Sequence, residues 1–243
     1  MPTATSTPCT ISFTDVHSTD YFYVPVLYLA CHGVISGYNT DPPCGGAGTP
    51  CFKPYNSTTR SQMVKIIVLG YNKPISTPTP AGAYTFTDVP PSNIFFPFVE
   101  TAAADNIVSG YTCGSPGEPC DPLNRPYFRP FANVTRGQLS KIDVIAAEWV
   151  LINPVTNSFE DVLPNTTFYE FIETAVCHGI ISGYTCGGPG EPCDPQNRPY
   201  FRQFNDATRG QISKIVYLSL TNPNPPGSCG QPTATPGTGA PSR

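Results

Sequence analysis

The apolar positions of this chain fall into two kinds of segment, and each kind occurs three times. The first kind is apolar at nearly every position and follows a polar start: YFYVPVLYLACHG (21–33), IFFPFVETAAADN (94–106) and FYEFIETAVCHG (168–179). The second kind, typified by Ile212, Ile215 and Val216, places its apolar residues on one stripe of a helix. Both kinds therefore predict helices, and Gly33, Asn106 and Gly179 stand where a helix ends in a left-handed residue.

These segments belong to an internal repeat. FTDV at 13–16 returns as FTDV at 86–89 and FEDV at 159–162, and SGY returns at the same interval of 73 residues. A repeat of this kind predicts one supersecondary unit used three times. We divide the chain into a Thr/Pro-rich arm (1–10), repeat 1 (11–72), a linker (73–84), repeat 2 (85–153), repeat 3 (154–222) and a Pro/Thr/Gly-rich arm (223–243).

Ten cysteines indicate an oxidising compartment, extracellular or periplasmic. Three pairs are spaced seven apart in Gly/Pro-rich segments without nearby histidine, which favours local disulfides over zinc knuckles: Cys44–Cys51, Cys113–Cys120 and Cys186–Cys193. We expect each to close a hairpin-like loop. For the other four, repeat position favours Cys9–Cys31 and Cys177–Cys229; Cys9–Cys177 with Cys31–Cys229, or a bridge between chains, is also possible.

Composition narrows the class of protein further. Only 12% of residues are charged and the net charge is −4, which argues against a nucleic-acid-binding surface. No apolar run reaches the length of a membrane span, and MPTATSTPCT is not a signal peptide, so we expect a mature or truncated secreted chain. No catalytic pairing, phosphate loop or metal-ligand set is visible. We therefore predict neither an enzyme nor a cofactor.

A Thr-Arg-x-Gln motif opens each second helix, at TTRSQ (58–62), VTRGQ (134–138) and ATRGQ (207–211). The threonine and glutamine predict a capping box, in which each side chain bonds the other residue's backbone N–H. The arginine is not explained by capping, because a positive charge opposes the helix dipole in the first turn. Its partner is either an internal carboxylate, with Asp15, Asp88 and Asp161 as candidates, or a carboxylate of a bound glycan.

The ordered motifs F-x-D-V, G-[IV]-[IV]-x-G-Y, F-x-P and T-R-x-Q resemble the S-layer homology (SLH) repeat over nearly all of residues 13–220. The resemblance implies a mainly α fold, a pseudo-threefold prism of three helix-loop-helix repeats, and anchoring to an acidic, often pyruvylated, cell-wall polysaccharide. It also implies glycan contacts by the motif arginines and the glycine-tyrosine turns: Arg60, Arg136, Arg209, Gly37, Tyr38, Gly110, Tyr111, Gly183 and Tyr184. The chain departs from the family by having Gln for Glu in that motif, Tyr or Phe for Trp, and the cysteine loop.

Two functions follow as hypotheses. The first is a structural protein of the cell surface that assembles with copies of itself into a layer or filament. The alternative is a non-covalent anchor that binds wall polysaccharide. Covalent glycans are expected in either case at the sequons Asn56, Asn133 and Asn165.

Overall fold

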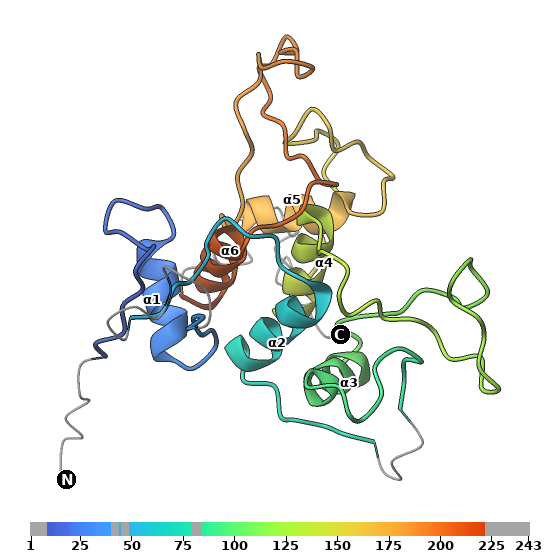
Figure 1. Cartoon of the computed structure of the whole chain (residues 1–243). Helices are drawn as coiled ribbons and strands as arrows, with labels where there is room; N and C mark the ends of the chain where they lie inside the picture. Colours follow the sequence, from blue (N-terminus) through green and yellow to red (C-terminus); the bar gives the residue numbers. More distant parts are fainter. Residues whose placement is uncertain (1–8, 40–43, 45–48, 79–83, 222–243) are drawn as a thin grey trace, which may run out of the picture.

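The chain is mainly α-helical (Figure 1). The computed structural model describes residues 9–39, 44, 49–78 and 84–221. In that part of the chain there are six helices and, instead of strands, only isolated β-bridges. The helices are α1 (Tyr23–Cys31), α2 (Arg60–Gly70), α3 (Phe96–Ala104), α4 (Arg136–Ala146), α5 (Tyr169–Cys177) and α6 (Arg209–Thr221).

Helix boundaries agree with the local signals in the sequence. Thr59 and Thr135 are the N-caps of α2 and α4, and both carry complete capping boxes with Gln62 and Gln138. Thr208 and Gln211 make the same two reciprocal hydrogen bonds at the start of α6, at 3.1 and 3.3 Å. These caps confirm the reading of the threonine and glutamine in the motif.

The first helix of each repeat ends as predicted, at a residue with positive φ. Gly33, Asn106 and Gly179 have φ values of 71°, 57° and 73°. In each case the N–H of the following residue bonds the carbonyl five residues back, as Val34 does to Leu29 at 2.9 Å. This Schellman geometry satisfies carbonyls that the helix end leaves free.

Helix packing joins different repeats. The outer helices α1, α3 and α5 pack against α6, α2 and α4 respectively, and α2, α4 and α6 contact one another at the centre (Figure 1). Each outer helix therefore rests on the central helix of the preceding repeat. Because α1 packs on α6, the first repeat meets the last and the arrangement closes into a ring.

A cycle of three backbone hydrogen bonds lies where the repeats meet. Thr58 N–H donates to the carbonyl of Ala207, Ala207 to Val134, and Val134 to Thr58, at 3.1, 2.8 and 2.9 Å. All three residues are fully buried. They stand at the same position of the three repeats, just before the central helices, so the contact has threefold symmetry in the backbone.

The Gly/Pro-rich segments 111–127 and 184–200 form disulfide-closed loops that project from the helices, and we call them the second and third fingers (Figure 1). The equivalent segment of repeat 1, residues 38–51, is called the first finger. The predicted bonds Cys44–Cys51, Cys113–Cys120 and Cys186–Cys193 are formed. Antiparallel bridges close the finger bases, as between Tyr111 and Tyr127. Cys9–Cys31 is also formed. Cys177 is disulfide-bonded, and its expected partner Cys229 lies outside the described residues, as do residues 1–8 and 222–243 of the two arms.

Incoming linkers are held by buried polar side chains on the outer helices. Glu100 on α3 accepts hydrogen bonds from the N–H and hydroxyl of Thr85, and Glu173 on α5 does the same for Ser158. The equivalent residue on α1 is Leu27. In repeat 1 the segment that precedes the F-x-D-V motif is attached to α1 by the disulfide Cys9–Cys31.

One buried carboxyl breaks the apolar pattern of the central helices. Asp143 on α4 is fully buried, and accepts hydrogen bonds from Tyr71 after α2, at 3.2 Å, and from Ser219 on α6. The residues equivalent to it, Ile67 and Val216, are apolar and buried. Burial raises the pKa of Asp143 to about 6, although the two hydroxyls favour its charged form.

This shift predicts an unusual pH dependence of stability. The folded chain holds the Asp143 proton more tightly than the unfolded chain, so the free energy of unfolding should fall as pH rises from about 4 to about 6. The carboxyl should account for about 3 kcal/mol of that fall. Urea denaturation across this range should show the fall in the native protein and lose it in Asp143→Asn. Asp105→Asn, at an exposed carboxylate, is the control; equal slopes for the native protein and Asp143→Asn would refute the prediction.

Candidate functional site

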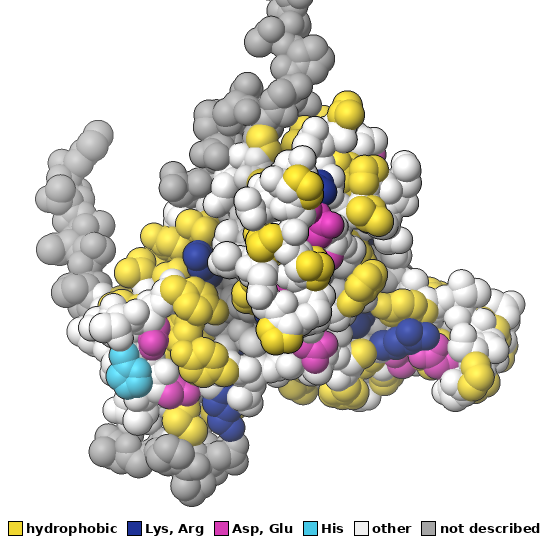
Figure 2. Space-filling view, turned by 90° about the horizontal axis from the view of Figure 1, so that it is seen from above, with side chains coloured by type: hydrophobic (Ala, Val, Ile, Leu, Met, Phe, Trp, Pro, Cys, Tyr) yellow, Lys and Arg dark blue, Asp and Glu magenta, His cyan; other side chains and the backbone are white. Residues whose placement is uncertain are grey.

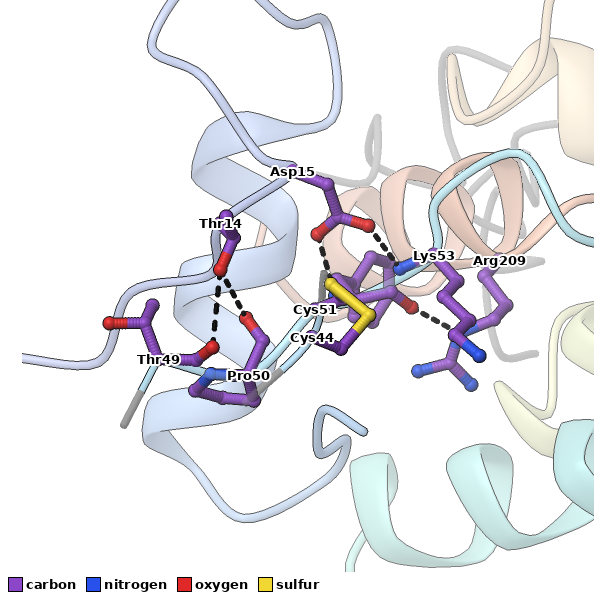
Figure 3. The surroundings of a disulfide bond; sticks show 9 residues. Thr14, Asp15, Cys44, Thr49, Pro50, Cys51, Lys53 and Arg209 are labelled. Carbon is purple, nitrogen blue, oxygen red and sulfur yellow. Dashed lines mark hydrogen bonds between the residues drawn. A yellow bond between two sulfur atoms is a disulfide. The ribbon is translucent and has the colours of Figure 1, made fainter. Parts of the chain in front are cut away.

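Each motif arginine lies against a peptide group at the base of a finger. Arg60 donates from Nε to the carbonyl of Phe128 at 2.8 Å, and Asp88 accepts the N–H groups of Phe128 and Arg129, both at 2.7 Å. The F-x-D-V aspartate and the arginine thus hold the same turn from its two sides. Figure 3 shows the equivalent set in repeat 1, where Asp15 and Arg209 flank the segment that follows Cys51.

The arginine always comes from the preceding repeat around the ring. Arg136 donates to the carbonyls of Phe201 and Ser182, at 2.7 and 3.2 Å. Arg209 donates to those of Phe52 and Ser36, at 2.8 and 3.0 Å. The last central helix is thereby tied to the first finger, which closes the ring a second time.

The candidate aspartates do not form close ion pairs with the arginines, although Asp88, Asp161 and Asp15 attract Arg60, Arg136 and Arg209 electrostatically. Among the described residues no ion pair joins Arg60, Arg136 or Arg209 to an aspartate. The aspartates instead accept backbone N–H groups, and the arginines donate to carbonyls. The three side chains are only 5–7% exposed, and this burial lowers the pKa of each guanidinium.

Aromatic rings enclose each guanidinium. Arg60 lies 5.1 Å from the ring centroid of Tyr111 and 4.7 Å from that of Phe128. Tyr111 also has Arg129 at 3.8 Å. The other two sites repeat this arrangement, with Arg136 at Tyr184 and Phe201 and with Arg209 at Tyr38 and Phe52. Cation–π contacts of this kind partly replace the lost hydration of a buried cation.

The glycines of the glycine-tyrosine turns have a packing role. A Cβ on Gly110 would lie 2.8 Å from the ring of Phe86 and 2.9 Å from the carbonyl of Tyr127. Gly37 and Gly183 have equally close neighbours. Only glycine leaves room at this turn for both the F-x-D-V phenylalanine and the backbone at the end of the finger. A contact of these glycines with a glycan stays a prediction.

Three grooves, one at each junction of repeats, contain the predicted residues. Their volumes are about 450, 170 and 300 Å³ for the grooves of Arg136, Arg60 and Arg209. Each is lined by one motif arginine, the turn of the next repeat with its tyrosine, the motif glutamine and an aromatic residue from the start of an outer helix. That aromatic residue is Tyr21, Phe168 or Phe95.

A lysine in each groove was not predicted as a site residue. Lys214, Lys141 and Lys65 each stand three residues after the motif glutamine and line the three grooves. Their constant position inside the motif was the available signal. No acidic residue lines any of the three grooves described here. Each groove therefore presents two cations without a carboxylate, which suits an anionic ligand.

The acidic residues of the fingers are already paired. Glu118 accepts two hydrogen bonds from Arg129, at 2.7 and 2.8 Å, and Glu191 is paired in the same way with Arg202. Asp121 and Asp194 bond Arg125 and Arg198. Basic and acidic side chains accordingly lie next to one another along the second finger, at the right of Figure 2. These ion pairs stabilise the fingers and the turns that directly follow them.

The three sequon asparagines are exposed. Asn133 donates from Nδ2 to a carboxylate oxygen of Asp206 at 2.6 Å, across the junction of repeats 2 and 3. Asn56 lies on the turn before α2, and Asn165 precedes α5. Modification of these side chains stays a prediction.

Comparison with protein families agrees with this geometry. Residues 85–140 match the family model of the S-layer homology domain. They contain the second F-x-D-V motif, α3, the second finger and the beginning of α4. This segment is thus an S-layer homology domain, a class of binding and anchoring module, and it indicates a cell-surface or cell-wall anchoring role. No curated protein matches the chain. No helix in the described part is long and apolar enough to cross a membrane.

The bonding of Arg60 predicts a structural effect in the absence of any ligand. Arg60→Met should leave the Phe128 carbonyl without its donor, and should lower the free energy of unfolding by about 1–3 kcal/mol. Lys141→Gln, in the same groove but outside this bond, should change it by less than about 0.5 kcal/mol. Guanidinium denaturation would measure both. Equal stability of Arg60→Met and the native chain would contradict a structural role for the arginine.

Proposed function

We propose that the chain anchors to the cell surface by binding an acidic cell-wall polysaccharide in the three grooves. The observation that carries the proposal is that every groove is lined by a buried arginine and by a lysine, and that none is lined by an acidic residue. A carboxylate-bearing sugar, such as a pyruvylated one, has the complementary charge. Desolvated charge pairs of this kind are stronger than pairs on an open surface.

The geometry supports a division of roles inside a groove. A guanidinium has five N–H donors, and backbone carbonyls take one of them in Arg60 and two each in Arg136 and Arg209. Remaining donors are available to a ligand carboxylate. The lysine adds a mobile charge, and the aromatic residue at the start of the outer helix offers an apolar surface for a sugar ring.

Three grooves on one body also favour a polymeric ligand. A polysaccharide with repeated acidic units can occupy more than one groove, and each additional contact is then intramolecular. Modest affinity in one groove becomes strong attachment to the wall. The proposed role is binding alone, without a catalytic step.

Lysine substitutions separate binding from folding. The triple variant Lys65→Gln, Lys141→Gln, Lys214→Gln should bind purified cell-wall sacculi at least tenfold more weakly, because it halves the positive charge of each groove. Binding by the native protein should weaken with added salt. The matched control is Lys73→Gln, at a lysine outside the grooves that is paired with Glu148 at 2.7 Å. Unchanged binding by the triple variant, or no binding by the native chain, would exclude the proposed function.

A second candidate function is self-assembly into a surface layer or filament, with glycans at Asn56, Asn133 and Asn165. One observation favours it: Tyr55, Phe131 and Phe204 occupy the same position in the three repeats and are 71–74% exposed. We infer that these repeated exposed aromatic residues form the contact surface between copies of the chain.

Sedimentation velocity and negative-stain microscopy test the assembly. Native protein should form regular polymers as its concentration rises, and Tyr55→Ser, Phe131→Ser, Phe204→Ser together should leave monomers. Leu163→Ser, at an exposed apolar residue elsewhere, is the control. Native protein that stays monomeric at high concentration would exclude this function. Sacculus binding by the same monomers would leave the anchoring function intact.

A further inference from the structure

A fourth cavity lies beside the third finger. Its volume is about 560 Å³, and it is lined by residues 188–191 of the finger, by residues 202–205 and by Asp161 and Tyr200. It shares no lining residue with the grooves. Its size is in the range of small-molecule sites.

Gln203 lines this cavity and has an unused acceptor. The side chain is only 3% exposed, and Nε2 donates to the carbonyl of Asp161 at 2.9 Å. That bond determines the orientation of the amide, because a carbonyl can only accept. Oε1 is then a buried oxygen without a hydrogen-bond partner. Such groups cost free energy, and an unpaired one in a native protein calls for a ligand or water.

The fold itself does not require glutamine at this position. Repeats 1 and 2 have Pro54 and Pro130 there. The backbone carbonyls of all three residues do the same work, accepting an N–H from the start of a central helix, as Gln203 does from Gly137 at 2.8 Å. The side chain of Gln203 is therefore an addition confined to repeat 3.

Charge in the cavity argues against an anionic ligand. Arg202 is paired through two hydrogen bonds with Glu191, and Asp161 accepts the N–H groups of Phe201 and Arg202. The lining residues carry two carboxylates and one guanidinium. A neutral ligand with hydroxyl donors fits this balance, in contrast to the grooves.

We propose that this cavity binds a neutral sugar unit. A small shift of the Gln203 side chain brings the buried Oε1 within reach of a sugar hydroxyl, and the C–H face of the ring packs against Phe204, which is 74% exposed and lines the same cavity. The site is independent of the acidic polysaccharide proposed for the grooves. It gives the third repeat a carbohydrate contact of its own.

NMR titration with three neutral disaccharides, cellobiose, maltose and N,N′-diacetylchitobiose, tests the proposal. At least one should shift the side-chain amide signals of Gln203, with saturation in the millimolar range. Gln203→Pro restores the residue found in repeats 1 and 2, so it should fold normally and abolish the binding. Phe204→Ser should weaken it at least tenfold, while Phe131→Ser, the matched change in repeat 2, should leave it unchanged.

Three results would overturn the proposal. They are no response to any of the disaccharides, equal binding by Gln203→Pro, and a response of Gln203 only to a peptide such as tri-alanine. The lysine triple variant of the grooves should bind the disaccharide like the native protein. Loss of sacculus binding in that variant with disaccharide binding retained would show that the two sites are separate.

Discussion

The architecture depends on the cycle of backbone hydrogen bonds among Thr58, Val134 and Ala207. Each of these buried groups finds its partner in another repeat, so no single repeat can satisfy its own backbone. The motif arginines add a second contact between repeats, because each one donates to a backbone carbonyl at the base of a finger in the next repeat. Every repeat therefore needs the closed ring to complete its backbone hydrogen bonds, and the grooves between repeats form only in that closed arrangement.

The motif arginine side chains contribute both to the stability of the fold and to the proposed recognition of a ligand. Arg60, Arg136 and Arg209 hold the finger turns through carbonyl bonds and also line the grooves. A guanidinium can do both because its donors point in several directions within one plane. In the described structure the lysines make only cation–π contacts with aromatic rings of the outer-helix segments, so the charge of a groove is less constrained at lysine than at arginine.

Much of the fold could be predicted from local sequence. The capping boxes, the helix ends at Gly33, Asn106 and Gly179, and the finger disulfides depend on residues close together in the chain. Contacts between distant residues could not be predicted in the same way. Arg209 bonds a carbonyl 157 residues away, and the sequence does not say that Asp15 is already satisfied by backbone N–H groups. The lysines of the grooves were visible inside the motif, but their role depends on which repeats are neighbours.

The packing of α1 on α6 has a mechanical consequence. Cys31 at the end of α1 is joined to Cys9, and α6 ends at Thr221. Tension applied between these two ends is carried from α1 to α6 through the interface they share, without passing through the helices between them. The α1–α6 interface, the seam of the ring, is thus the first contact between helices that such tension loads. Opening that seam would break the hydrogen bonds of Arg209 to the carbonyls of Phe52 and Ser36, and would also open the groove that Arg209 lines.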